Sequence, residues 1–229
     1  MKEKIISIIN QKGGVGKTTT VINLAAGLSI QGKKVLVIDL DPQGNATTGL
    51  GLSNLENSEK SIYSVLNGAK KLSEVIEITK FENLDLITSN VDLSGLEVET
   101  AGDAKRAFIL NEQIMAYLND SGGQYSHILI DCPPSLSLLT IMALVASESL
   151  LVPLQTEFFA LEGVTQLMKT IERIKNNLNP DLLIRGILLT MYDKRNKLSA
   201  EVEKEAREYF KEKVYQTVVP RNVRLSEAP

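Results

Sequence analysis

Near the start of the chain stands the glycine-rich stretch Asn10-Gln11-Lys12-Gly13-Gly14-Val15-Gly16-Lys17-Thr18-Thr19-Thr20. It follows an apolar run at residues 5–9, typical of a strand, and precedes a helical pattern at residues 18–30. Glycines in such a turn let successive backbone N–H groups point at one anion, and the helix N-terminus adds partial positive charge. The context predicts a phosphate-binding loop in which Lys17 reaches the β- and γ-phosphates and the Thr18 hydroxyl binds Mg²⁺.

Two residues distinguish this loop from the usual phosphate-loop pattern. Gln11 stands where the pattern has its first glycine, and Lys12 adds a second lysine beside the glycines. One interpretation of Lys12 is a solvated loop residue. The other is a charge that reaches a second nucleotide across a dimer interface, as an arginine finger in trans does.

Apolar runs at regular intervals predict a mainly parallel sheet. The run at residues 35–38 is continuous rather than alternating, which is typical of a strand buried on both faces, and helical patterns separate the runs. Strands are expected at residues 35–38, 84–87, 127–131, 150–153, 183–189 and 214–219. Helices are expected at residues 61–66, 73–78, 92–99, 104–118, 161–178 and 201–211, with a turn at Ser121-Gly122-Gly123. We therefore expect an α/β fold, a twisted parallel sheet with helices on both faces, forming a single domain over residues 1–229.

Acidic residues follow two of these strands. Asp39 and Asp41 come after residues 35–38, and Asp131 ends the strand at residues 127–131. Ligands of open α/β sheets bind at the carboxyl ends of the strands, so these acids are candidates for a magnesium and water site. Turn formation beside Pro42 and Pro133 is the alternative interpretation.

Composition limits the function classes. The net charge of −3 argues against a general attraction to nucleic acid, so any DNA contact has to come from a local patch. One cysteine, Cys132, excludes an internal disulfide and a multi-cysteine metal site. No signal peptide is expected, and the apolar region at residues 136–154 is interrupted by Glu148 and Pro153, which predicts a helix and a strand rather than a membrane span.

The loop resembles that of a known family. The run from Lys12 to Thr18 resembles the deviant Walker A motif of the ParA/MinD group of P-loop ATPases, and residues 10–20 resemble the chromosomal ParA (Soj) branch. The resemblance implies a P-loop NTPase fold and slow hydrolysis of ATP with Mg²⁺. It implies nucleotide binding by Lys12, Gly13, Gly14, Val15, Gly16, Lys17, Thr18, Thr19, Met191, Pro220 and Asn222.

The same resemblance implies roles for the acids. Asp131 matches the Walker B acid and Asp39 the other magnesium-side acid, so the metal would be held by Thr18, Asp39 and Asp131. Asp41 would orient the attacking water and would be catalytic together with Lys12 and Lys17. Residues 39–45 and 131–135 resemble the two switch segments that sense the γ-phosphate.

Two later segments also match the family. Residues 190–195 and 219–229 resemble its base-pocket and partition-specific loops, which implies that Met191, Pro220 and Asn222 line the adenine. For Met191, plain core packing is the alternative. Arg195 and Arg224 match arginines that contact DNA in chromosomal ParA proteins, and ordinary solvated arginines are the alternative there.

The resemblance implies a cytoplasmic, nucleoid-associated DNA-partitioning ATPase. Its ATP-bound homodimer would bind nonspecific DNA and leave it after hydrolysis stimulated by a ParB-like (Spo0J-like) protein, in chromosome or plasmid segregation, without a membrane partner. The first alternative is a MinD-like membrane-associated positioning ATPase, a class that needs a basic amphipathic helix at its C-terminus, and this chain has none.

Two further alternatives are open. An iron–sulfur P-loop reductase would need more cysteines than Cys132. A nucleotide-binding module without enzymatic activity is the other alternative, if truncation has destroyed turnover. Relatives continue past residues 226–229 into a further strand and helix. The resemblance thus implies either a C-terminally truncated chain that lacks these two elements or a chain in which other packing replaces them.

Overall fold

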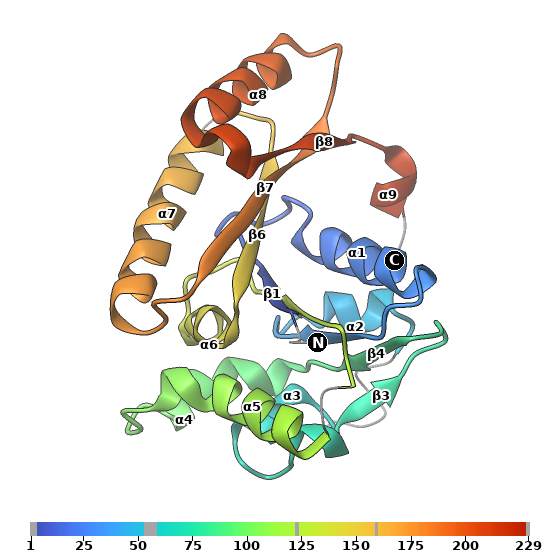
Figure 1. Cartoon of the computed structure of the whole chain (residues 1–229), viewed down its shortest axis with the longest axis vertical. Helices are drawn as coiled ribbons and strands as arrows, with labels where there is room; N and C mark the ends of the chain where they lie inside the picture. Colours follow the sequence, from blue (N-terminus) through green and yellow to red (C-terminus); the bar gives the residue numbers. More distant parts are fainter. Residues whose placement is uncertain (1–3, 53–58, 122–123, 159, 228–229) are drawn as a thin grey trace.

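The fold is built on one mixed sheet. The computed structural model describes residues 4–52, 59–121, 124–158 and 160–227. The described strands join in the order β3-β4-β2-β5-β1-β6-β7-β8 (Figure 1), with all neighbours parallel except β3 and β4. The strands are β1 (Lys4–Ile8), β2 (Val35–Asp39), β3 (Ile76–Ile78), β4 (Leu84–Ile87), β5 (His127–Asp131), β6 (Ser149–Gln155), β7 (Leu183–Tyr192) and β8 (Val214–Pro220).

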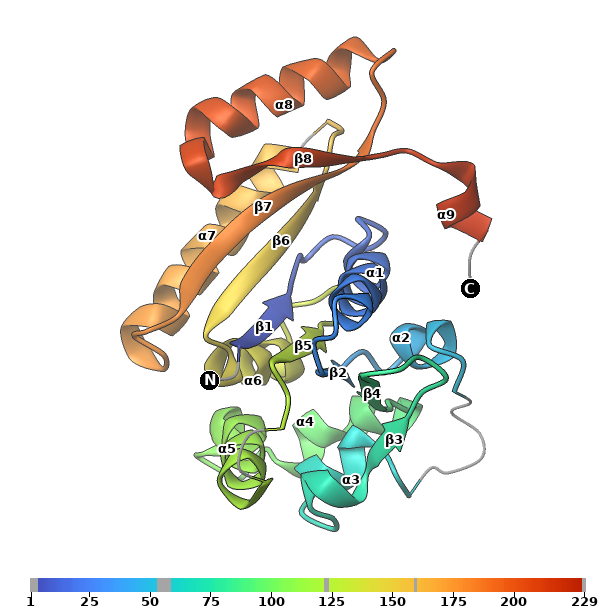
Figure 2. The ribbon, with the colours of Figure 1, turned by 45° about the vertical axis from the view of Figure 1, so that its right-hand side comes forward.

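Helices cover both faces of the sheet, as predicted. One face carries α1 (Lys17–Ile30) and α2 (Asn45–Gly49), and α9 (Val223–Glu227) projects beyond β8 (Figure 2). The other face carries α3 (Ile62–Leu66), α4 (Leu96–Glu99), α5 (Ile109–Ser121), α6 (Leu138–Ala146), α7 (Ala160–Asn177) and α8 (Lys197–Phe210). None of the described helices is both long and apolar enough to cross a membrane.

The central strands have no solvent-facing side, which explains their unbroken apolar runs. In β2, Leu36 and Ile38 belong to the core under α3 to α8, while Val35 and Val37 belong to the core under α1. All four side chains are fully buried. The predicted α/β fold class is therefore confirmed, with cores on both faces of the sheet.

Some element predictions were wrong in detail. The helix expected at residues 73–78 is a 3₁₀ turn at Leu72–Glu74 followed by β3, because the β-branched residues after it pair antiparallel with β4. The helix expected from residue 104 begins as α5 at Ile109, after a 3₁₀ turn. In contrast, α8 begins earlier than expected because the Asn196 side chain caps it, accepting a hydrogen bond from Leu198 N.

Two short helices, α2 and α9, were not predicted. Of the predicted turn at residues 121–123, Ser121 is the last residue of α5. Gly122 and Gly123 lie outside the described residues, as do Ala228 and Pro229 of the partition-like segment.

The strand order gathers the predicted site at one edge of the sheet. β5 lies between β2 and β1, so Asp131 is the register partner of both Asp39 and Ile8. The phosphate loop follows Ile8 at the same edge. Parallel strands present their carboxyl ends together, and this is how residues 8, 39 and 131 meet.

Candidate nucleotide-binding site

The loop between β1 and α1 has the backbone of a phosphate cradle. Gly14 and Gly16 have φ angles of 73° and 88°, in the left-handed region that side chains disfavour. A Cβ atom at either position would meet nothing within 4 Å, so conformation rather than space requires glycine there. Gly16 is also the N-cap of α1, which places the loop around the positive end of the helix.

Lys17 lies inside this loop although it is the first residue of α1. Its side chain is buried, and Nζ donates a hydrogen bond to the carbonyl oxygen of Lys12 at 3.1 Å. Burial lowers the pKa of Lys17, and the nearby charge of Asp131 acts in the opposite direction. The ammonium group is therefore held on the concave side of the loop, where phosphate oxygens would lie.

Asp131 is a buried carboxylate without a hydrogen-bond donor. Neither of its oxygens accepts a hydrogen bond from the described residues. Burial raises its pKa well above the ordinary range, the neighbouring Asp39 adds to the shift, and the Thr18 hydroxyl and Lys17 oppose it. A buried carboxylate in this state is poised for a cation or for a water held by one.

Asp39 is also buried, but its oxygens are occupied. Oδ2 accepts hydrogen bonds from Thr47 N at 2.8 Å and Thr47 Oγ1 at 2.7 Å, and Oδ1 accepts one from Asp41 N at 3.2 Å. Burial nevertheless raises the pKa of Asp39 to about 6, against the effect of the Thr47 hydrogen bonds. Asp39 therefore ties the segment after β2 to the start of α2.

Asp41 belongs to the turn that follows β2. Its Oδ1 accepts a hydrogen bond from Gln43 N at 3.0 Å, and its backbone oxygen accepts one from Ser89 Oγ at 2.6 Å. The turn leads into α2 through Gly44, whose φ of 63° again requires glycine-like freedom. The side chain is mostly buried beside Asp39 and Lys17.

The donor set fits a hard divalent cation. No group of three His, Cys, Asp or Glu within the described chain forms an all-protein metal cage. Mg²⁺ in nucleotide enzymes does not need one, because one or two carboxylates and phosphate oxygens hold it. The unpartnered oxygens of Asp131, next to the hydroxyl of Thr18, match that requirement; Asp39 stands behind them with its oxygens already bonded.

Lys12, the second lysine, lies on the rim of the loop. Its side chain is 52% exposed and forms an ion pair with Glu157, which follows β6. Its backbone N–H donates to Asn10 Oδ1 at 3.0 Å, and Asn10 Nδ2 donates to the carbonyl oxygen of Pro153 in β6 at 2.7 Å. Asn10 therefore fixes the start of the loop against β6.

The predicted adenine-side residues come to the same edge of the sheet. Thr190 in β7 donates a hydrogen bond through Oγ1 to the carbonyl oxygen of Val15 at 2.9 Å, which joins β7 to the phosphate loop. Met191 follows with a φ of 51°, a strained value for a non-glycine residue, as occurs at functional sites. Pro220 is paired in register with Tyr192, and the Asn222 side chain accepts a hydrogen bond from Arg224 N.

The sequence of this chain is similar to those of known proteins. A family model described as an AAA domain matches residues 3–184. The chain is 50% identical over 226 residues to the chromosome partitioning protein ParA of Caulobacter vibrioides, covering 99% of this chain and 84% of that protein. It is 49% identical over 226 residues to the sporulation initiation inhibitor protein Soj of Bacillus subtilis, covering 99% and 87%.

The chain belongs to the ParA/Soj family of partitioning ATPases. Its fold is shared more widely. The crystal structure of cobyrinic acid a,c-diamide synthase from Mycobacterium smegmatis, with a bound ATP analogue and magnesium, matches with a TM-score of 0.89 at 36% identity, covering 99% of this chain and 91% of that one. The predicted P-loop NTPase fold and the predicted family are both confirmed.

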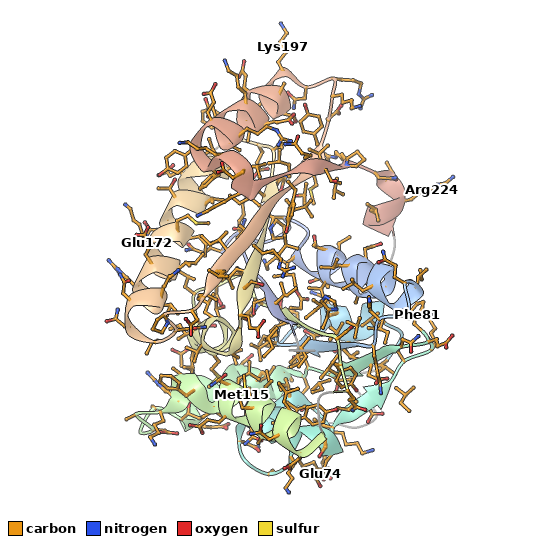
Figure 3. All side chains as sticks on the ribbon, in the orientation of Figure 1. Glu74, Phe81, Met115, Glu172, Lys197 and Arg224 are labelled. Atoms are coloured by element: carbon orange, nitrogen blue, oxygen red, sulfur yellow. The ribbon has the colours of Figure 1, made fainter. Side chains whose placement is uncertain are left out.

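The ParA/Soj resemblance also implied two DNA-contacting arginines, and both are exposed. Arg195 donates hydrogen bonds from Nε and Nη2 to the Asp193 carboxylate at 3.1 and 3.0 Å, and it lowers the pKa of Asp193 to about 2. Arg224 lies on α9, and its side chain extends away from the molecule (Figure 3). Asp193 therefore offsets part of the Arg195 charge, which the sequence alone did not indicate.

Several residues that shape this ParA/Soj site were not singled out from the sequence. They hold the loops rather than carry the chemistry: Asn10, Thr47, Glu157 and Thr190. Asn10 and Thr47 lie close to recognised motifs, so a search for side-chain caps near them could have found them. Glu157 and Thr190 lie far from the loop in sequence, and only the strand order brings them to it.

Proposed function

We propose that this ParA/Soj protein is an ATP-driven dimer that binds nonspecific DNA and leaves it when a ParB-like (Spo0J-like) protein stimulates hydrolysis. The observation that carries the proposal is Lys12, a half-exposed second lysine at the rim of the phosphate loop. Lys17 already serves the phosphates of its own subunit, so Lys12 is available to the nucleotide of a partner. The relatives' names, chromosome partitioning protein and Soj, support a role in segregation on the nucleoid, in the cytoplasm.

The nucleotide is ATP and the metal is Mg²⁺. This assignment is supported by the Mycobacterium smegmatis structure, which is 36% identical and holds an ATP analogue with magnesium. When bound, Mg²⁺ supplies positive charge to the phosphates. Thr18 and Asp131 would hold it, Asp39 would keep the following segment in place, and the Lys17 ammonium would exchange the Lys12 carbonyl for phosphate oxygens.

Asp41 is the residue we assign to hydrolysis. It stands at the entrance of the segment after β2, held by its backbone bond to Ser89, so its carboxylate can orient a water for in-line attack. Replacing Asp41 by alanine should slow phosphate release about 100-fold or more, the usual effect of losing such a group, while ATP binding persists. The ATP-bound dimer should then accumulate in light scattering.

The matched control is Asp120→Ala, which removes an exposed carboxylate near the end of α5 and should change neither property. An Asp41→Ala protein that stays monomeric and fails to hold ATP would mean that the residue organises the site or ligates the metal.

DNA contact is assigned to Arg195 and Arg224. A chain of net charge −3 has no general attraction to a polyanion, so cations have to be gathered locally. Both arginines are exposed, on the β7–α8 connection and on α9. Each subunit would offer a weak patch, and dimerisation would join two of them, so that ATP raises avidity without new contacts.

Charge reversal tests this assignment. Arg195→Glu and Arg224→Glu should each lose ATP-dependent DNA binding while ATP hydrolysis and dimerisation continue. If four arginines of a dimer contact phosphates, wild-type affinity should fall roughly 100-fold between 50 and 200 mM salt, because each contact releases counterions. Binding is measured by fluorescence anisotropy on duplexes of unrelated sequence, with Arg173→Glu, an exposed reversal on α7, as the control.

Two additions to the assay separate the alternatives. A ParB-like protein should speed hydrolysis and release the DNA. Anionic liposomes should not sediment the ATP-bound protein; if they do and DNA does not, the MinD-like alternative is correct. DNA affinity that is insensitive to salt, or unchanged in the double reversal, would place the DNA surface elsewhere.

A further inference from the structure

The Lys12 ammonium group is engaged within its own subunit. Nζ contacts Oε1 of Glu157, which stands two residues beyond the end of β6. The two side chains are 52% and 31% exposed. Oε1 itself is buried and accepts no hydrogen bond from any other described residue, so Lys12 is the group that offsets its charge.

The backbone of Lys12 is held from the same direction. Asn10 connects its N–H to the carbonyl oxygen of Pro153 in β6, and Lys17 Nζ donates to its carbonyl oxygen. β6 and the residues just after it therefore hold Lys12 at both the main chain and the ammonium group. Only the ammonium group can leave without disturbing the phosphate loop.

We propose that Glu157 is a positioning residue for Lys12, which keeps the ammonium group in its own subunit until a partner's nucleotide replaces the carboxylate. The proposal rests on the proposed role of Lys12 across the dimer interface. One ammonium cannot stay against the buried Glu157 oxygen and also reach a second subunit, so the pair has to break as the dimer forms. A half-exposed pair is weak enough to be exchanged for the greater negative charge of a triphosphate.

Breaking this ion pair adds a free-energy cost to dimerisation. In the absence of a partner's ATP, the pair favours the separated subunit. In the dimer two pairs are broken, so their contributions multiply. Removing the Glu157 charge should therefore favour the ATP-bound dimer. The affinity of a single subunit for ATP should not change.

The test uses Glu157→Gln, which keeps the shape of the side chain and removes its charge. Losing a partly exposed ion pair changes an equilibrium constant about 1.4- to 5-fold per subunit, so the dissociation constant of the dimer should fall roughly two- to twenty-five-fold. It is measured by analytical ultracentrifugation with a non-hydrolysable ATP analogue and Mg²⁺, at low and high salt. The effect should shrink at high salt because the pair is partly exposed.

Controls separate positioning from a general change of charge. Glu172→Gln removes an exposed carboxylate from the outer side of α7 (Figure 3) and should leave the dissociation constant unchanged. Glu157→Asp, which restores the charge on a shorter side chain, should return the value toward wild type. ATP affinity, measured at protein concentrations far below the dimer dissociation constant, should be the same in all three variants.

The outcomes distinguish this inference from the proposed function. Lys12→Ala combined with Glu157→Gln should behave as Lys12→Ala alone. If Lys12→Ala loses the dimer but Glu157→Gln leaves its dissociation constant unchanged or raises it, the positioning role is wrong and the proposed function stands. If Lys12→Ala dimerises and hydrolyses ATP normally, the proposed function of Lys12 itself is wrong.

Discussion

Lys17→Ala should lose ATP binding, with an affinity at least about 100-fold below wild type, as expected when one partner of a buried charge pair is removed. The reason is the position of Nζ: it lies inside the phosphate loop, bonded to the Lys12 carbonyl, and its charge is buried near Asp131. Among the described residues no other lysine is buried. Titration with a fluorescent ATP analogue measures the loss.

Lys12→Ala is the matched comparison because it removes the same charge a few residues away. It should bind ATP nearly as well as wild type in the monomer, since its side chain points to Glu157 at the rim. Its defects should appear in light scattering, as a missing ATP-bound dimer, and in turnover. Equal loss of ATP affinity in both variants would show that the two lysines act on one nucleotide.

Asp131→Asn should produce a more stable protein that no longer hydrolyses ATP. The wild-type carboxylate is fully buried, accepts no hydrogen bond from the described residues and lies beside Asp39. An unsatisfied buried polar group costs about 1–3 kcal/mol, which corresponds to a rise in Tm of roughly 2–12 °C for a chain of this size when the charge is removed. Differential scanning fluorimetry without nucleotide measures the rise.

The rise in Tm caused by Asp131→Asn should depend on pH in a defined direction. Burial raises the folded-state pKa of both Asp131 and Asp39, the latter to about 6 from 3.8. Between those values the unfolded chain has lost its proton and the folded chain has kept it, so stability falls as pH rises. The Tm advantage of Asp131→Asn should therefore be small at pH 4 and larger at pH 7.5.

Adding Mg²⁺ and ATP should make the wild type more stable than Asp131→Asn. The wild type gains stability by binding its ligands, and the variant, without the Asp131 carboxylate, should gain much less. A variant that is less stable than wild type at every pH would mean that Asp131 has a partner that offsets its charge in the folded protein.

Much of this architecture could be predicted from local patterns. The runs at residues 35–38 and 128–130 are apolar throughout because both faces of β2 and β5 are buried, and continuous runs of this kind identify central parallel strands. The phosphate loop was equally clear, because Gly14, Gly16 and Lys17 each have a separate physical reason to be there. Local sequence is enough where one element determines its own conformation.

The parts of the fold and of the site that could not be predicted depend on which strands are neighbours in the sheet. β3 was taken for part of a helix because its three residues are too few to distinguish a strand period from a helix period, and pairing with β4 decides it. The contacts of Thr190 with Val15 and of Glu157 with Lys12 join residues far apart in the chain. No spacing in the sequence encodes such pairs, so they require the strand order.

The place of β1 between β5 and β6 matters while the protein is being synthesised. The ribosome delivers residues 10–20 first, yet the strands on either side of β1 are complete only at Asp131 and Gln155. At usual elongation rates, Gln155 follows Thr20 by about 7 to 27 s. Until Asp131 has been made, residues 5–9 have neither strand partner, and until Gln155 they still lack β6, so we expect this segment to need protection from aggregation during synthesis.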